Sequence, residues 1–181
     1  GDALPTLFSH LWRSSKLRVC ADGAANRLHD ALDDEARGGH LPDLIAGDLD
    51  SLRDDVAQFY AARGVPIARQ PEQDRHDFEK CLRWLQVQQE ATGSKQPYSV
   101  VAYGAFGGRL DQQMANLNML FRRDFQCFER FVGCGEGGEL NVGHDIVQHL
   151  GGSGILDDAD AFPFQRFGRA IHIGSRQQAG S

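Results

Sequence analysis

The chain has 181 residues, of which 41% are hydrophobic, enough to form the core of one ordinary domain. Its formal net charge of −6 argues against binding to a nucleic-acid backbone, which normally requires a basic face, whereas an acidic protein can bind a polyphosphate through a divalent cation. No apolar stretch approaches the roughly 20 residues that span a bilayer, and residues 1–10 lack the pattern of a secretory signal. The four cysteines include no Cys-x-x-Cys pair, which indicates reduced thiols in the cytoplasm.

From residue 17 to residue 122, short apolar runs alternate with amphipathic segments, a pattern typical of βαβ units around a mainly parallel sheet. A short helix-like stretch at residues 7–12 precedes them. We expect strands at residues 17–21, 44–46, 65–68 and 98–103. Four helices are expected from apolar residues that recur at helical spacing. Their stripes are Ala25, Leu28 and Leu32; Val56, Phe59 and Tyr60; Phe78, Cys81, Leu82 and Leu85; and Leu110, Met114, Leu117 and Phe121. Ser51 is expected to cap the second of these helices. The predicted fold class is α/β, a doubly wound, Rossmann-like sheet with helices on both faces.

After residue 122 the pattern changes. Residues 125–181 are rich in glycine, their apolar residues have no steady period, and we expect no series of strands and turns there. The sequence therefore predicts an α/β nucleotide- and metal-binding domain over residues 1–124 and an irregular region over residues 125–181.

Acidic residues follow each of the four expected strands. They are Asp22 after the first strand, Asp48 and Asp50 after the second, Asp74 and Asp77 after the third, and Asp111 after the fourth. The carboxyl ends of the strands form the edge of an open α/β sheet at which ligands bind. Asp48 and Asp50 are two residues apart in an extended segment, so their side chains are expected to point the same way.

A cluster of carboxylates repels itself unless a cation lies among its members. Mg²⁺ is the natural candidate, because it takes carboxylate oxygens, water and substrate phosphate as ligands. Separate, solvated loop aspartates are the alternative, but the placement of all of them after strands favours a metal site. The fourth strand also leads to Gly107 and Gly108, which let the backbone approach a phosphate, and to Arg109, which supplies a cation for its oxygens.

Four motifs occur in order along residues 17–122. They are Ala-Asp-Gly-Ala-Ala-Asn-Arg-Leu at 21–28, Gly-Asp-Leu-Asp-Ser at 47–51, Gln-Asp-x-x-Asp-Phe-x-Lys at 73–80 and Gly-Gly-Arg-Leu-Asp-Gln at 107–112. In order, spacing and residue type they resemble the motifs of the thiamine pyrophosphokinases, most closely those of the animal enzymes. The resemblance implies transfer of a diphosphate from ATP to the hydroxyl of thiamine, giving thiamine diphosphate and AMP. It also implies Mg²⁺ as the cofactor and a homodimer that holds thiamine near the subunit interface.

The same resemblance implies a role for each matching residue. The expected metal ligands are Asp48, Asp50 and Asp77. The expected nucleotide and phosphate contacts are Asp22, Gly23, Asn26, Arg27, Ser51, Gln73, Asp74, Lys80, Gly107, Gly108 and Arg109. Asp111 and Gln112 are expected where thiamine approaches. Either Asp74 or Asp111 is the carboxylate that accepts the hydroxyl proton, and the residues leave that choice open.

The sequence departs from the family in two regions. The additional N-terminal strand of the family is not recognised before residue 17, and residues 125–181 do not resemble its C-terminal β-sandwich. We therefore expect a replaced tail, from truncation, alternative splicing or a mispredicted gene. The main alternative function is then a catalytically incomplete fragment that binds nucleotide and metal. A metal-dependent phosphohydrolase is the third hypothesis, because Asp-x-Asp after a strand occurs in such enzymes, but it leaves the other three motifs unexplained.

Overall fold

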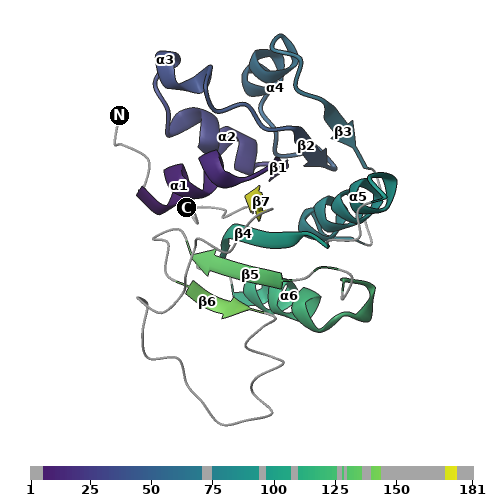
Figure 1. The fold of residues 1–181 in the computed structure, drawn as a ribbon. Coiled ribbons are helices and arrows are strands. Elements are labelled where there is room, and N and C mark those ends of the chain that lie inside the picture. Colours follow the sequence, from purple (N-terminus) through teal and green to yellow (C-terminus); the bar gives the residue numbers. More distant parts are fainter. Residues whose placement is uncertain are drawn as a thin grey trace.

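The computed structural model describes residues 6–70, 75–93, 97–106, 110–125, 128, 130–135, 140–143 and 170–174. Its strands are β1 (Leu17–Ala21), β2 (Leu44–Gly47), β3 (Ile67–Arg69), β4 (Ser99–Phe106), β5 (Arg130–Gly135), β6 (Leu140–Gly143) and β7 (Ala170–Gly174). They form one seven-stranded sheet in the order β3-β2-β1-β7-β4-β5-β6 (Figure 1). Neighbouring strands are parallel except for β5 and β6, which are antiparallel.

Helices cover both faces of this sheet. They are α1 (Thr6–Ser14), α2 (Ala24–Asp30), α3 (Asp34–Arg37), α4 (Asp54–Ala61), α5 (Asp77–Ala91) and α6 (Leu110–Phe121), followed by a short 3₁₀ helix, η1 (Arg123–Phe125). None of the described helices is long and apolar enough to cross a membrane.

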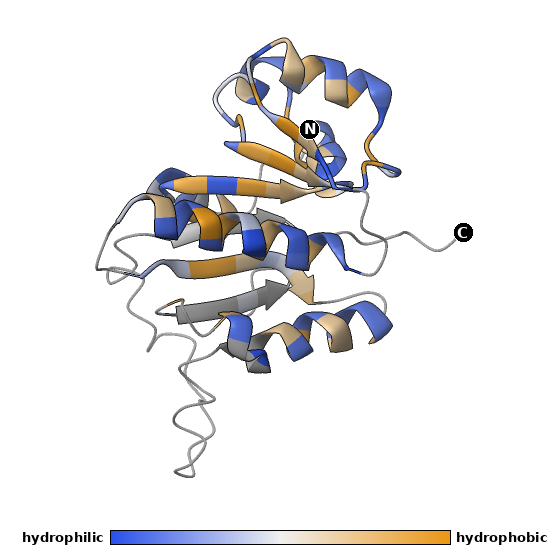
Figure 2. Ribbon diagram, turned by 90° about the vertical axis from the view of Figure 1, so that its right-hand side faces the viewer, coloured by the Kyte–Doolittle hydropathy of each residue, from blue (hydrophilic) through white to orange (hydrophobic). Residues whose placement is uncertain are grey.

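The strands of the sheet divide their buried residues between two cores. In β1, Val19 and Ala21 pack with α5 and α6, whereas Cys20 packs with α1, α2 and α4 on the opposite face. The same alternation sends Leu44 and Ala46 of β2 to the first core and Ile45 to the second. Figure 2 shows the apolar strands between amphipathic helices. The prediction of a doubly wound α/β sheet is therefore confirmed.

Three differences between the predicted elements and the structure concern the third strand, the start of α4 and the residues after 122. The third strand begins at Ile67, two residues later than expected, and ends at Arg69. Helix α4 begins at Asp54 with Arg53 at its N-cap position, so the prediction that Ser51 caps this helix is wrong. The hydroxyl of Ser51 instead donates to the Oδ1 atom of Asp50, because the chain between β2 and α4 first makes a separate turn.

The third difference lies beyond residue 122, where three strands form although the sequence showed no strand series. These strands have four to six residues each, and β5 and β7 pair with strands from residues 17–106. Pairing with an existing sheet can impose an extended conformation on a segment that has no clear period of its own. The division of the chain at residue 124 stays a prediction.

Candidate metal centre

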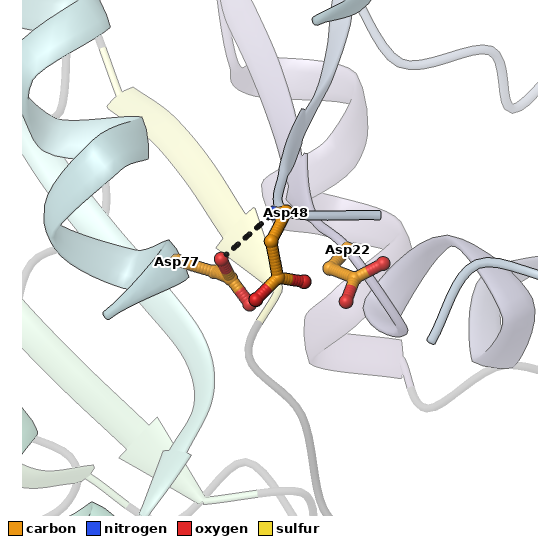
Figure 3. A group of neighbouring side chains, drawn as sticks. All are labelled: Asp22, Asp48 and Asp77. Carbon is orange, nitrogen blue, oxygen red and sulfur yellow. Dashed lines mark hydrogen bonds between the residues drawn. The ribbon is translucent and has the colours of Figure 1, made fainter. Parts of the chain in front are cut away.

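Three carboxylates meet at the carboxyl edge of β1 and β2. Asp22 directly follows β1, Asp48 directly follows β2, and Asp77 is the first residue of α5. One ligand oxygen from each of the three lies within 4.8 Å of the others (Figure 3). The carboxyl ends of the neighbouring parallel strands β1 and β2 lie side by side, so Asp22 and Asp48 come close together although they are far apart in sequence.

Gly47 makes this close approach possible. A Cβ atom at this position would lie 2.7 Å from the Cβ of Asp22 and 3.2 Å from the Cγ of Asp77. No other residue type therefore fits between the two aspartates without moving one of them. The backbone N–H of Asp48 then donates to the Oδ1 atom of Asp77 at 3.2 Å, which ties the end of β2 to the start of α5.

The backbone is strained at two non-glycine residues of the site. Asp22 has a φ of 30° and Leu49 a φ of 65°, both in the left-handed region that residues with a Cβ seldom adopt. Hydrogen bonds hold these conformations. The N–H of Asp22 donates to the carbonyl of Ala46 at 2.9 Å, and the N–H of Asp50 donates to Oδ1 of Asp48 at 3.1 Å. Strain of this kind concentrates at functional sites.

Asp22 is the most deeply buried of the three carboxylates, with 1% of its surface exposed. Its Oδ2 atom accepts the N–H of Ser51 at 3.3 Å, but Oδ1 has no hydrogen-bond partner within the described residues. Burial, reinforced by the nearby charge of Asp77, raises the pKa of Asp22 to about 6. A buried carboxylate oxygen without a donor, beside two further carboxylates, fits the all-oxygen donor set that Mg²⁺ prefers.

Lys80 lies one turn further into α5 and contacts Asp77. Its side chain is 1% exposed, and its Nζ atom is 3.0 Å from Oδ1 of Asp77. The buried position was not foreseen from the sequence, because lysine is seldom fully buried.

Asn26 fastens the turn between β2 and α4 to helix α2. Its Nδ2 donates to the carbonyl of Ser51 at 2.7 Å, and its Oδ1 accepts the N–H of Arg53 at 3.1 Å. The guanidinium of Arg53 in turn binds both carboxylate oxygens of Asp30 at 2.6 and 2.7 Å. Both ends of the Asn26 amide are thus used to hold the loop that carries Asp48.

The remaining expected site residues lie in three groups. Asp50 is exposed and is not part of the three-carboxylate cluster, so its role as a metal ligand stays a prediction. Gly23 is the N-cap residue of α2, Arg27 is half-buried in that helix, and Asp111 and Gln112 lie in the first turn of α6. Gln73, Asp74, Gly107, Gly108 and Arg109 are outside the described residues.

The sequence placed Asp22 among the aspartates at the ligand-binding edge but assigned it to the nucleotide rather than to the metal. The structure brings it into one group with Asp48 and Asp77, and its role at the nucleotide stays a prediction. Gly47 was noticed only as part of a motif, although a glycine directly before an aspartate at a strand end was a usable signal for close backbone approach.

Comparisons with known proteins agree that the chain is similar to thiamin pyrophosphokinases. Residues 8–131 match the family model described as thiamin pyrophosphokinase, catalytic domain. Thiamine pyrophosphokinase 1 of Arabidopsis thaliana is 39% identical over 132 residues, which cover 66% of this chain and 48% of that protein. The thiamine pyrophosphokinase of Saccharomyces cerevisiae is 31% identical over 154 residues, covering 64% of this chain and 48% of that protein.

Solved structures give the same result. The crystal structure of yeast thiamin pyrophosphokinase superposes with a TM-score of 0.65 at 29% identity, covering 72% of this chain and 54% of that one. Thiamin pyrophosphokinase from Candida albicans shares the fold with a TM-score of 0.64 at 24% identity, over 74% of this chain and 55% of that one. The chain spans about half the length of the relatives that it matches.

Proposed function

The chain belongs to the thiamin pyrophosphokinase family through its catalytic domain, and on that premise we propose that it transfers the diphosphate of ATP to the hydroxyl of thiamine. The products are thiamine diphosphate and AMP. The observation that carries the proposal is the cluster of Asp22, Asp48 and Asp77 at the ligand-binding edge of a sheet whose motifs match the family.

The proposed reaction is an in-line displacement at phosphorus. The hydroxyl oxygen of thiamine forms a bond to the β-phosphorus of ATP, the bond from that phosphorus to the oxygen bridging to the α-phosphate breaks, and AMP leaves with the electron pair. The hydroxyl proton passes to Asp74 or Asp111, the two candidates for the base. Such reactions depend chiefly on positioning and on stabilisation of negative charge.

We assign Mg²⁺ to Asp22, Asp48 and Asp77, with Asp50 as a further candidate on the adjoining turn. When bound, Mg²⁺ offsets the charge of the transferred diphosphate. Asn26 keeps the loop of Asp48 and Asp50 in place through its two hydrogen bonds. Arg27, Arg109, Gly107 and Gly108 are assigned to the phosphates by the family motifs.

Location and assembly also belong to this proposal. Cys20 and Cys81 are free, buried thiols, which is consistent with a reducing compartment such as the cytoplasm. A homodimer with thiamine near the subunit interface is proposed from the family resemblance.

The test is direct. The full chain is mixed with ATP, Mg²⁺ and thiamine, and AMP and thiamine diphosphate are quantified by chromatography. We expect equal amounts of both products, with AMP formation dependent on thiamine and abolished by Asp48→Asn. AMP formation that ignores thiamine would contradict the proposal.

A second candidate function is a fragment that binds nucleotide and metal without turnover. It requires only the cluster of Asp22, Asp48 and Asp77, which the structure brings together, and neither of the candidate bases Asp74 and Asp111. Calorimetry would then detect binding of ATP with Mg²⁺, whereas the reaction mixture would contain no thiamine diphosphate.

A further inference from the structure

Lys80 occupies a position that is costly for a charged side chain. It is 1% exposed and ranks among the largest fully buried side chains. A buried ammonium group is tolerated only when it is paired, because it loses its hydration. Among the residues that the structure describes, its Nζ atom is paired with Oδ1 of Asp77 at 3.0 Å. A side chain so enclosed is poorly placed to contact the phosphates, the role that the family resemblance implies.

The contact determines how Asp77 presents its two oxygens. Oδ1 accepts from both the Nζ of Lys80 and the N–H of Asp48. The other oxygen of Asp77 points toward the carboxylate of Asp48 (Figure 3). One oxygen is therefore held by protein donors, and the second is directed into the cluster.

The charges of the cluster also indicate that a cation belongs there. The three carboxylates of the cluster outnumber the single ammonium of Lys80, and the carboxylate of Asp50 also lies next to Asp22, so the site has a surplus of negative charge that a divalent cation would offset. The unpartnered, buried Oδ1 of Asp22 is a separate indication that a cation belongs there.

We propose that Lys80 is a positioning residue of the metal centre, which holds Asp77 by its Oδ1 atom so that Oδ2 faces the cation. This inference rests on the proposed function only for the identity of the cation as the magnesium cofactor. A group that orients a metal ligand typically changes metal affinity by 10–100-fold when it is removed.

The test measures the dissociation constant of Mn²⁺, a spectroscopic substitute for Mg²⁺, from the electron paramagnetic resonance signal of the free ion. We expect Lys80→Met to weaken binding by about tenfold or more. Lys16→Met, which removes the charge of an exposed lysine, is the matched control and is expected to leave the constant unchanged. Removal of a mere counter-charge would instead tighten binding, because it increases the negative charge of the site.

A double-mutant cycle shows whether Lys80 acts through Asp77. In the background of Asp77→Asn, the further change Lys80→Met should alter the constant by less than twofold, because the ligand that Lys80 orients is already lost. Full additivity of the two changes would overturn the inference. If Lys80→Met fails to fold, Lys80→Gln, which keeps a donor but no charge, is measured in its place. Because a donor to Asp77 remains, the constant is expected to stay unchanged, whereas tighter binding would show that Lys80 is only a counter-charge and would overturn the proposal.

The outcomes separate this inference from the proposed function. If Mn²⁺ binding depends on Lys80 but the protein makes no thiamine diphosphate, the inference is supported and the proposed activity is contradicted. If the parent chain turns over and Lys80→Met has an unchanged dissociation constant for Mn²⁺, the inference is contradicted and the proposed function stands. A parent chain that binds no Mn²⁺ overturns the role of Lys80.

Discussion

Gly47 is the residue on which the geometry of the metal centre depends most directly. It ends β2, and its missing side chain leaves the space in which Asp22 and Asp77 come together. The added Cβ of an alanine would lie within 3.2 Å of three atoms of the proposed ligands Asp22 and Asp77, so packing and metal binding are coupled at this one position.

We predict that Gly47→Ala lowers the free energy of unfolding by about 1–3 kcal/mol, the usual cost of overpacking, and weakens Mn²⁺ binding at least tenfold. Gly38→Ala is the control, because the added Cβ would lie at an ordinary 3.8 Å from the carbonyl oxygen of Glu35. Thermal unfolding and metal titration of both variants check this expectation. Unchanged metal affinity in Gly47→Ala would mean that the aspartates do not need this spacing.

Asp22 should make the metal-free protein less stable as the pH rises. Its pKa lies near 6 in the folded protein against an ordinary value of 3.8, so folding favours the protonated form. The stability that this group contributes is complete below about pH 4 and is lost as the pH rises through about 6. The difference corresponds to at most about 3 kcal/mol.

This expectation is checked by urea unfolding between pH 4.5 and 7.5 in the presence of a chelator. Asp22→Asn should show a flatter profile over that interval. Carboxylates whose pKa is lowered, such as Asp30 at about 2, lose their contribution only at more acidic pH and do not interfere. Equal slopes for the parent chain and Asp22→Asn would contradict the raised pKa.

At the scale of elements, α5 is the helix that links the metal centre to the rest of the fold. Its first turn carries Asp77 and Lys80, and its buried face packs against β1 and β2. On another face, the buried carboxylate of Glu79 binds Arg83 at 3.0 Å and Arg122 at 2.8 Å. Asp124 accepts from both arginines, so this network, which we call the Glu79 network, joins α5 to the end of α6 and η1.

We predict that Glu79→Ala lowers the free energy of unfolding by about 1–3 kcal/mol, because Arg83 and Arg122, and more weakly Arg75 at 3.7 Å, lose their shared, buried partner. The arginines are each about a third exposed, so water limits the loss. Glu90→Gln, an exposed position near the end of the same helix, is the control and should change stability by less than about 0.5 kcal/mol. Chemical unfolding followed by circular dichroism measures both, and equal effects would show that the network contributes nothing.

At the scale of the whole molecule, β7 occupies the centre of the sheet. It is parallel to β1 on one side and to β4 on the other, with Ile171 opposite both Leu17 and Val100. The strands β3, β2 and β1 are thereby joined to β4, β5 and β6 through a segment from the C-terminal part of the chain. The edges of β1 and β4 that face each other both form backbone hydrogen bonds with β7.

We predict that a chain ending at residue 169 loses cooperative unfolding, because the facing edges of β1 and β4 are left without their partner. A chain ending at residue 174 keeps β7 and should unfold like the full chain. Calorimetry of the three proteins compares the sharpness of the transitions. A cooperative transition in the shorter chain would show that the two halves join without β7.

Local sequence patterns were enough to predict four strands between residues 17 and 106, the doubly wound class and the placement of aspartates after strands. These depend on local periodicity and on short motifs, which are visible within a few residues. The tertiary structure was needed to show which of these carboxylates come within reach of one ion, that Lys80 is buried next to Asp77, and that β7 enters the middle of the sheet. Those outcomes depend on contacts between residues tens of positions apart, where packing and the loss of hydration, rather than any local pattern, select the arrangement.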